Sequence, residues 1–335
     1  MKTDKSYLVV AALAAVVIAF PAFLGAYPLN VARSIMTYMA LAISWDMLLR
    51  SGQISFGIAG LFGLGSYASA LAVLRGGMDP FLSIIFAALF AGAVAFALGF
   101  AILRLRAIYF SITTLALMEI FKISIHNLHD FSGGPEGVVL PSTIFGGNAS
   151  ALYWLCLAGL FITIGTSWYF EKSKLHLALT AIRNDEISAR SSGVNIFKYL
   201  LIAFVVTSTI QGMMGAIQVQ SYGFATPDSS FDANFTLLPL AMALLGGIHS
   251  TMGPMAGAVL LGLSSEFLKL RMPYGHLVVY GVIIIIVILF MPQGLLGMWR
   301  QARRSAKRTP VSAREAGVPA READARGGQK QGVQK

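Results

Sequence analysis

The sequence predicts an all-α polytopic membrane protein. Of its 335 residues, 56% are hydrophobic and only 12% are charged, whereas soluble domains carry about 25% charged residues. Long apolar runs recur along the chain, and about 20 apolar residues cross a bilayer as a helix in which every backbone polar group is paired. This composition also excludes disorder for most of the length, because disordered chains combine low hydrophobicity with high charge.

Ten apolar runs are candidate spans. They comprise residues 7–24, 31–49, 54–74, 81–103, 107–125, 151–170, 199–219, 235–248, 254–270 and 277–297. The run at 235–248 is short and ends in Gly246-Gly247, which indicates a half-helix or a tilted segment. The chain is therefore expected to have about ten transmembrane helices, within a range of eight to ten.

Lys and Arg are distributed unevenly between alternate loops of this arrangement. When both termini are placed in the cytoplasm, 20 of the 25 basic residues fall on the cytoplasmic side. The other five are Arg33, Arg75, Lys122, Lys269 and Arg271. Because short cytoplasmic loops are enriched in Lys and Arg, the distribution predicts cytoplasmic N- and C-termini.

The two ends of the chain differ in character. Lys2, Lys5 and the apolar run that follows resemble a signal peptide, but no A-x-A cleavage site follows them, so an uncleaved first helix is expected. Residues 299–335 are rich in Arg, Ala, Gly and Gln and are expected to form a disordered, basic cytoplasmic tail. Residues 1–298 are expected to form the transmembrane domain.

Several kinds of chemistry are not indicated by the sequence. Its single cysteine, Cys156, offers no disulfide or thiolate cluster. There is no Gly-Lys dipeptide and hence no phosphate-binding loop, and G-x-S-x-G does not occur. His126, His129 and Asp130 have metal-ligand spacing but no further matching ligand nearby. We therefore expect no catalytic, cofactor or metal site, and any ATP must be bound by another subunit. The basic excess lies largely in the tail, so no nucleic-acid partner is expected.

Charged residues within the spans lie close enough in sequence to pair on one helix face. The pairs are Asp46 with Arg50, Glu119 with Lys122, and Glu266 with Lys269. Local ion pairs and snorkelling lysines are the favoured interpretation, and a proton relay is the alternative. No chain of carboxylates crosses the bilayer, which argues against a proton-driven carrier.

Two segments, residues 51–70 and 246–262, are rich in glycine and other small residues. Small residues let helices approach closely, so simple helix packing is one interpretation and a substrate-lining role is the other. The segments lie in opposite halves of the chain, which suits moving helices around a central path.

The largest loop of the membrane region, Glu171–Lys198, has amphipathic helical character. Asn184 or Asp185 is able to cap a helical turn, and Gly193 is expected to end it. Such a helix suits a groove on a soluble partner, and it equally suits a charged loop lying at the lipid interface.

Residues 181–208 resemble a known functional segment. They read AIRNDEISARSSGVNIFKYLLIAFVVTS, which is similar to the coupling segment of LivH/LivM-type permeases of branched-chain amino acid ABC importers. In that family the segment is the counterpart of the E-A-A-x-x-x-G signature and docks on ATPase subunits. The resemblance favours docking over a lipid-facing loop. It implies a coupling role for Ala181, Ile182, Arg183, Asp185, Glu186, Ile187, Ser188, Ala189 and Gly193, with Glu186 one place earlier than in the strict signature.

Further segments match the same family in order. They are SGQISFGIAGLFGLGSYASA, RAIYFSITTLALMEI, SGGPEGV, LLGGIHSTMGPMAGAVLLG and MPQGLLG, and together they favour a LivM-type permease subunit. The resemblance implies translocation of Leu, Ile or Val across the bacterial cytoplasmic (inner) membrane. It also implies three kinds of partner: a LivH-like second permease, two ABC ATPase subunits and an extracytoplasmic amino acid-binding protein.

Seven small or polar residues in these matching segments are candidates for the translocation path, or else they satisfy backbone groups and pack helices. They are Gln53, Ser55, Tyr109, Thr113, Thr114, Gly133 and Gly134. Two other functions stay open: a urea or short-chain amide importer permease, and a stand-alone channel or secondary carrier. An enzyme is the least supported, because no paired nucleophile and base is visible.

Overall fold

Helices make up almost all of the regular structure. The computed structural model describes residue 21, residues 25–141 and 143–271, and residues 281, 282, 285 and 294. The α-helices are α2 (Ala26–Leu49), α3 (Ile58–Leu74), α4 (Pro80–Ile102), α5 (Ile108–Asn127), α6 (His129–Ser132), α7 (Ala149–Lys172), α8 (Lys174–Asn184), α9 (Glu186–Ser191), α10 (Ile196–Tyr222), α11 (Pro227–Ser230), α12 (Asn234–Gly246) and α13 (Met252–Arg271). Two short 3-10 helices, η1 (Gly134–Glu136) and η2 (Ile144–Gly147), and two strands, β1 (Val138–Val139) and β2 (Phe224–Ala225), complete the elements of the described residues.

Eight of the ten predicted spans lie within the described residues, and each coincides with a helix. In the described part, α4, α5, α7 and α10 are long and apolar enough to cross a membrane. The helical fold class is therefore confirmed, and the number of crossings stays a prediction. The predicted span at 7–24 lies outside the described residues apart from Pro21, and the tail at 299–335 lies wholly outside them. The span at 277–297 lies outside them except for four isolated positions.

Two elements differ in length from an ordinary span. The predicted helix at 54–74 starts late, because α3 begins only at Ile58 and the residues before it are irregular. Helix α12 has 13 residues, so it is about 20 Å long, shorter than the hydrocarbon core of about 30 Å. This length agrees with the half-helix interpretation of residues 235–248.

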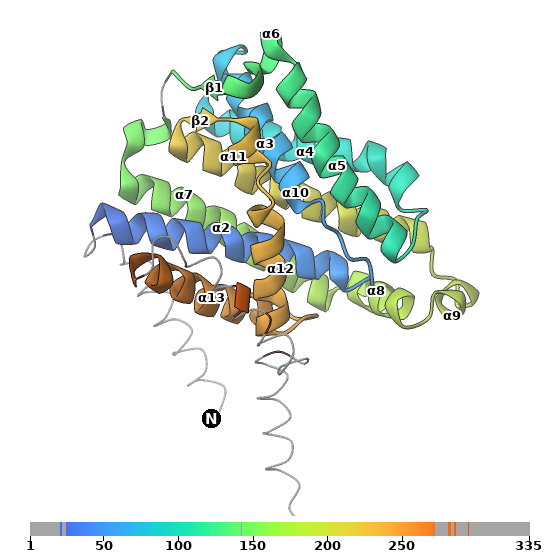
Figure 1. The fold of residues 1–335 in the computed structure, drawn as a ribbon. Coiled ribbons are helices and arrows are strands. Elements are labelled where there is room, and N and C mark those ends of the chain that lie inside the picture. The colour runs from blue at the N-terminus through green and yellow to red at the C-terminus, as the bar shows by residue number, and fades with distance from the viewer. Residues whose placement is uncertain are drawn as a thin grey trace, which may run out of the picture. The chain divides into compact units, whose positions relative to one another are not determined.

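Helix α10 lies at the centre of the helical packing. It contacts α2, α3 and α4, while α2 also contacts α7, α12 and α13. Helix α5 packs mainly against α3 and lies towards the outside (Figure 1). The most buried positions accordingly cluster on α2, α3 and α10.

Glycines allow α3 and α10 to touch through their backbones. A Cβ atom on Gly65 would lie 2.1 Å from the carbonyl oxygen of Gly212, and one on Gly215 would lie 2.0 Å from that of Phe62. The Ser66 hydroxyl donates to the Gly215 carbonyl at 2.9 Å. The packing interpretation of the first glycine-rich segment is therefore confirmed.

The second glycine-rich segment forms a tight helical hairpin, α12–α13. A Cβ on Gly257 would lie 1.8 Å from the Met242 carbonyl oxygen, and one on Gly253 would lie 1.7 Å from that of Gly247. The two helices are therefore in backbone contact close to the turn that joins them, and no side chain separates them there.

The connecting segments gather at two opposite ends of the helices (Figure 1). Helices α8 and α9 lie at one end, where Arg106 of the α4–α5 connection pairs with Glu186 and Gly52 packs against Arg183. At the other end β1 pairs antiparallel with β2, with Val138 opposite Ala225. The loops predicted to be cytoplasmic therefore share one end.

The predicted local ion pairs have different outcomes. Asp46 and Arg50 pair at 3.0 Å, and Glu266 and Lys269 pair at 3.5 Å, so both predictions are confirmed. The Glu119–Lys122 pairing is wrong. Helix α11 lies beside α5, and Lys122 Nζ pairs with Asp228 Oδ1 at 2.8 Å instead.

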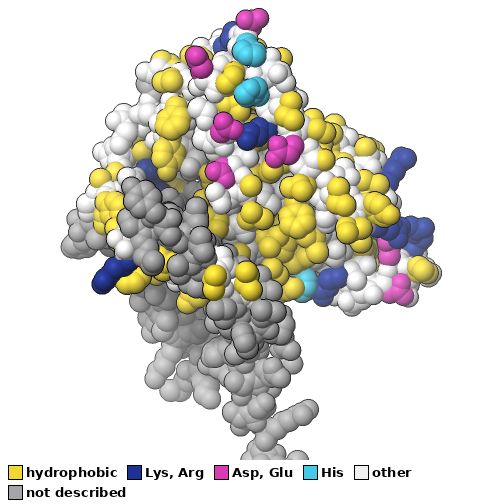
Figure 2. Space-filling model, viewed as in Figure 1, with side chains coloured by type: hydrophobic (Ala, Val, Ile, Leu, Met, Phe, Trp, Pro, Cys, Tyr) yellow, Lys and Arg dark blue, Asp and Glu magenta, His cyan; other side chains and the backbone are white. Residues whose placement is uncertain are grey.

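Hydrophobic side chains are spread over the coloured part of the face shown in Figure 2, and charged ones gather in a few places on it. Large exposed apolar residues occur on α4, α5, α7 and α13. Large apolar side chains exposed on several helices are typical of surfaces that contact lipid or another protein. Examples are Leu89, Ile112, Ile162 and Leu263.

We predict that Gly65→Ala destabilises the protein, because its methyl group forces α3 away from α10. Overpacking of this kind costs about 1–3 kcal/mol. The thermal unfolding midpoint of the purified chain should therefore fall by several degrees. The matched control is Gly165→Ala on α7, where nothing lies within 4 Å of the added Cβ. Equal midpoints for the two variants would show that the close helix contact is unimportant.

Candidate functional site

Helices α8 and α9 form an amphipathic segment at one end of the molecule. Leu175, Leu179 and Ile182 of α8 are buried against the protein. On the outer side, Leu177 is 71% exposed and Ile187 of α9 is 79% exposed. The segment therefore exposes some apolar side chains to its surroundings, while other apolar side chains pack it against the rest of the protein.

Asp185 separates α8 from α9 and caps the second helix. Its side chain accepts hydrogen bonds from the Ile187 backbone N–H at 2.9 Å and from the Ser188 hydroxyl at 2.6 Å. These bonds, led by the Ser188 hydroxyl, hold the pKa of Asp185 below its ordinary value. Of the two predicted caps, the structure selects Asp185.

Gly193 ends the segment, as predicted. Its φ of +82° lies in the left-handed region that side chains disfavour. The Val194 N–H donates to the Ala189 carbonyl at 3.0 Å, which closes the end of α9. Nothing lies within 4 Å of a Cβ built on Gly193, so this turn is open to a partner.

Glu186 connects α9 to the α4–α5 connection. It pairs with Arg106 and also with Arg190 at 3.5 Å. Beside these groups is a cavity of about 270 Å³, lined by Gln53, Leu103, Arg104, Arg106, Glu186, Arg190, Ile196, Phe197 and Leu200. The other predicted coupling residues lie on the same segment: Ala181 half-buried, Ala189 buried and Arg183 against Gly52.

The irregular residues before α3 form hydrogen bonds with side chains of other helices. Trp45 Nε1 donates to the Ser55 carbonyl at 2.9 Å, and the Ser111 hydroxyl donates to the Ile54 carbonyl at 2.7 Å. The Phe56 N–H donates to Thr114 Oγ1 at 3.0 Å. Irregular backbone at membrane depth requires such partners, because lipid supplies none.

Three of the predicted path residues, Gln53, Ser55 and Thr114, lie around this break. The Ser55 hydroxyl oxygen accepts from the Gly57 N–H at 3.2 Å, and Thr114 accepts from Phe56, so both stabilise the backbone. The Gln53 side-chain oxygen is buried and has no hydrogen-bond partner in the described part of the chain.

The other four predicted path residues lie elsewhere. Tyr109 is 69% exposed on α5, and Thr113 is half-buried on the same helix. Gly133 and Gly134 form a tight turn at the opposite end, where a Cβ on Gly133 would lie 1.9 Å from the Gly137 carbonyl oxygen. The seven residues therefore do not form a single lining.

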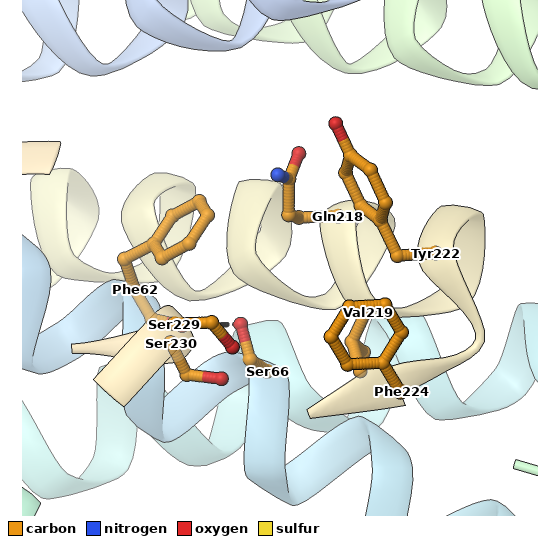
Figure 3. A pocket seen from close by; sticks show the side chains of 8 residues that line it. All are labelled: Phe62, Ser66, Gln218, Val219, Tyr222, Phe224, Ser229 and Ser230. Atoms are coloured by element: carbon orange, nitrogen blue, oxygen red, sulfur yellow. Dashed lines mark hydrogen bonds between the residues drawn. The ribbon is translucent and has the colours of Figure 1, made fainter. Parts of the chain in front are cut away.

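A cavity of about 130 Å³ lies between α3, α10 and α11, and sequence reasoning missed it. It is lined by Phe62, Ser66, Gln218, Val219, Tyr222, Phe224, Ser229 and Ser230. Gln218 and Tyr222 stand one turn apart on α10 and project in the same direction (Figure 3). Its residues come from three separate segments, so no local pattern in the sequence indicates it.

A charged cluster surrounds Arg50, and sequence reasoning predicted only its Asp46–Arg50 pair. Besides Asp46 it includes Glu171 and Ser167 of α7 and Thr251 of the α12–α13 connection. These five residues are called the Arg50 network below. For the contacts beyond that pair, the one available signal was a carboxylate, Glu171, at the end of a predicted span.

Histidine and acidic side chains do not gather into a metal site in the described residues, where no group of three or more His, Cys, Asp or Glu has suitable geometry. His129 Nδ1 lies 3.1 Å from the Asn127 carbonyl oxygen. The His129 ring also leaves no room for a side chain at position 134, because a Cβ on Gly134 would lie 2.7 Å from it.

Known proteins resemble this chain over most of its length. The permease protein LivM of the high-affinity branched-chain amino acid transport system in Escherichia coli K12 is 28% identical over 327 residues, with 89% of this chain and 76% of the relative covered. LivH of Salmonella typhimurium is 30% identical over 292 residues, with 78% of this chain and 91% of the relative covered. BraD of Pseudomonas aeruginosa is 25% identical over 284 residues, with 78% of this chain and 92% of the relative covered. No solved structure matches the chain.

The family described as "branched-chain amino acid transport system / permease component" matches residues 27–288, which is well over half of the chain. This range includes the break before α3, the Arg50 network and the α8–α9 segment. The members of the family are transport subunits rather than enzymes. The chain therefore belongs to the family of permease components of branched-chain amino acid transport systems.

Proposed function

We propose that this chain is a permease subunit of an ABC importer that moves branched-chain amino acids into the bacterial cytoplasm. The α8–α9 segment is the observation that carries the proposal. It exposes Ile187 and Leu177, caps α9 with Asp185 and ends at an open glycine. The relatives named as branched-chain amino acid permeases support the cargo.

The α8–α9 segment docks in a groove of a partner ATPase. An exposed apolar residue flanked by charges is typical of a helix that binds a groove, and α9 offers Ile187 between Glu186 and Arg190. The chain has no phosphate-binding loop of its own, so two partner ATPase subunits bind and hydrolyse the ATP. No cofactor is required in this chain.

The α8–α9 end of the molecule faces the cytoplasm. Arg50, Arg104, Arg106 and Arg183 are on segments that meet at this end, and an excess of basic residues marks the cytoplasmic side. With an even number of crossings, eight or ten, both termini are then cytoplasmic, and the membrane is the bacterial inner membrane.

A LivH-like second permease completes the path, and an extracytoplasmic binding protein delivers the amino acid. Hydroxyl groups near the break, including those of Ser55 and Thr114, are occupied by backbone bonds. A region with few free polar groups suits the aliphatic side chain of such an amino acid. The cavity beside Phe62, Tyr222 and Phe224 suits an apolar side chain at the opposite end.

Replacing Gly193 by Pro is expected to abolish uptake while the chain still inserts in the membrane. Proline fixes φ near −65° and cannot adopt the +82° found there. Charge reversal of both Asp185 and Glu186 should have the same effect. The measurement is ATP-dependent uptake by proteoliposomes that contain the whole complex.

The matched control is Gly193→Asn, since Asn tolerates the left-handed conformation better than other side chains, and it should keep most of the uptake. Normal uptake by Gly193→Pro and by the charge-reversed variant would contradict the docking role. Flux through the isolated chain without ATPases would favour a channel or secondary carrier.

Asp185→Ala is expected to fray α9, whereas Asp185→Asn keeps a capping oxygen and preserves it. Amide hydrogen exchange of the purified full chain should therefore show faster exchange at Ile187 and Ser188 in the Ala variant only. Because the pKa of Asp185 is lowered, the stabilisation by its carboxylate is present above an ordinary Asp value of about 3.9 and is lost as the pH falls through the lower folded value. Equal exchange in all three proteins would show that the cap is unimportant.

A further inference from the structure

The Arg50 network joins three elements that are distant in sequence. Arg50 Nε, at the end of α2, pairs with Asp46 Oδ2 at 3.0 Å, and its Nη2 lies 3.3 Å from Glu171 Oε1 of α7. The same Nη2 donates to Ser167 Oγ at 3.0 Å and lies 3.4 Å from Thr251 Oγ1. One guanidinium group therefore contacts α2, α7 and the turn of the α12–α13 hairpin.

Two carboxylates hold the turn of this hairpin in place. Glu171 Oε1 accepts from the Thr251 N–H at 2.6 Å and from its hydroxyl at 2.8 Å. Asp46 Oδ1 accepts from the His249 N–H at 2.5 Å. His249 has a φ of +64°, a conformation uncommon for a residue other than glycine. The turn is thus fixed by α2 on one side and by α7 on the other.

Both anchors of the turn adjoin helix α8. Glu171 lies in the last turn of α7, and α8 begins only three residues later at Lys174. The turn that follows Arg50 packs on α8 as well, since a Cβ on Gly52 would lie 3.4 Å from Arg183 Cγ. A displacement of α8 therefore acts on both carboxylate-bearing helices.

The network is suited to transmit force because it is multiply bonded and its central Asp46–Arg50 pair is buried, while Glu171 is 30% exposed. The Arg50 and Asp46 side chains are 1% and 0% exposed, and separating a buried ion pair is costly. The hairpin beyond it is equally tight, because Gly253 and Gly257 bring α12 and α13 into backbone contact. The turn and its two helices therefore move together.

We propose that the Arg50 network is a rigid strut that carries the movement of α8 to the α12–α13 hairpin, with Arg50 and Glu171 as positioning residues. This inference rests on the proposed function, in which partner ATPases move α8. The half-helix α12 then shifts with each ATPase cycle and changes access to the path. The hairpin is driven from its turn, where the two carboxylates hold it.

Glu171→Ala tests the strut in the reconstituted complex. The change removes the acceptor shared by Arg50 and Thr251, so the turn loses its Glu171 anchor on α7 and keeps the Asp46 anchor on α2, and the movement of α8 should reach the hairpin only in part. The ATP hydrolysed per amino acid transported should rise about tenfold or more, while ATP hydrolysis itself continues. The matched control is Glu266→Ala at the far end of α13, which removes an ion pair with Lys269 and should leave this ratio unchanged.

A covalent link should rescue the variant. Ser167 Oγ and Thr251 Oγ1 are 2.8 Å apart, so Ser167→Cys and Thr251→Cys place two thiols in bonding range. In the Glu171→Ala background, oxidation should restore the wild-type ratio and reduction should raise it again. Cys156 is buried on α7, eleven residues and about 16 Å from position 167, so it does not compete.

The outcomes separate the strut from the proposed function. A wild-type complex without ATP-driven uptake overturns the proposed function and the strut with it. An active wild type together with an unchanged ratio in Glu171→Ala, or a disulfide that fails to restore the ratio, overturns the strut alone. If Glu171→Ala does not assemble, Glu171→Gln takes its place, because it keeps the oxygen and loses the charge. Its ratio should rise by a smaller factor, and no change overturns the strut.

Discussion

The fold depends on pairing the backbone polar groups between α2 and α3, where the chain is irregular and not helical. Lipid offers no hydrogen bonds to such a segment, so Trp45, Ser111 and Thr114 supply them from α2 and α5. Thr236 of α12 supplies another by accepting from the Ala59 N–H at 3.1 Å. One short segment thereby fixes the positions of α2, α5 and α12 around the start of α3.

Backbone contacts and buried charges then divide the helices into units that move together. Glycines join α3 to α10 and α12 to α13 so closely that neither pair is able to slide freely, because packed interfaces change by discrete steps and do not deform continuously. The Arg50 network connects the α12–α13 pair to α8, while Glu186 connects α9 to the α4–α5 connection. The exposed side of α8–α9 is therefore well placed to receive a push from outside the chain.

Local features of the sequence predicted local features of the structure. Hydropathy located eight helices, because the cost of crossing lipid is set residue by residue. Asp185 and Gly193 identified the start and end of α9, because helix caps depend on residues close in sequence. The predicted start of α3 was wrong, because the side chains that bond to the irregular backbone before it come from other helices. The same reason explains what could not be predicted: the partner of Lys122, the contacts of the Arg50 network beyond the Asp46–Arg50 pair, and the cavities. Positions such as Asp46 and His249 meet only in the folded chain.

The most direct test of the central claim is the accessibility of a cysteine placed at Ile187, because Cys156, the one native thiol in the chain, is buried. A membrane-impermeant thiol reagent should label Ile187→Cys only from the cytoplasmic side, and bound ATPase subunits should protect it. Labelling from the outside, or full labelling in the assembled complex, would contradict the assignment of α9 as the surface on which the ATPases act.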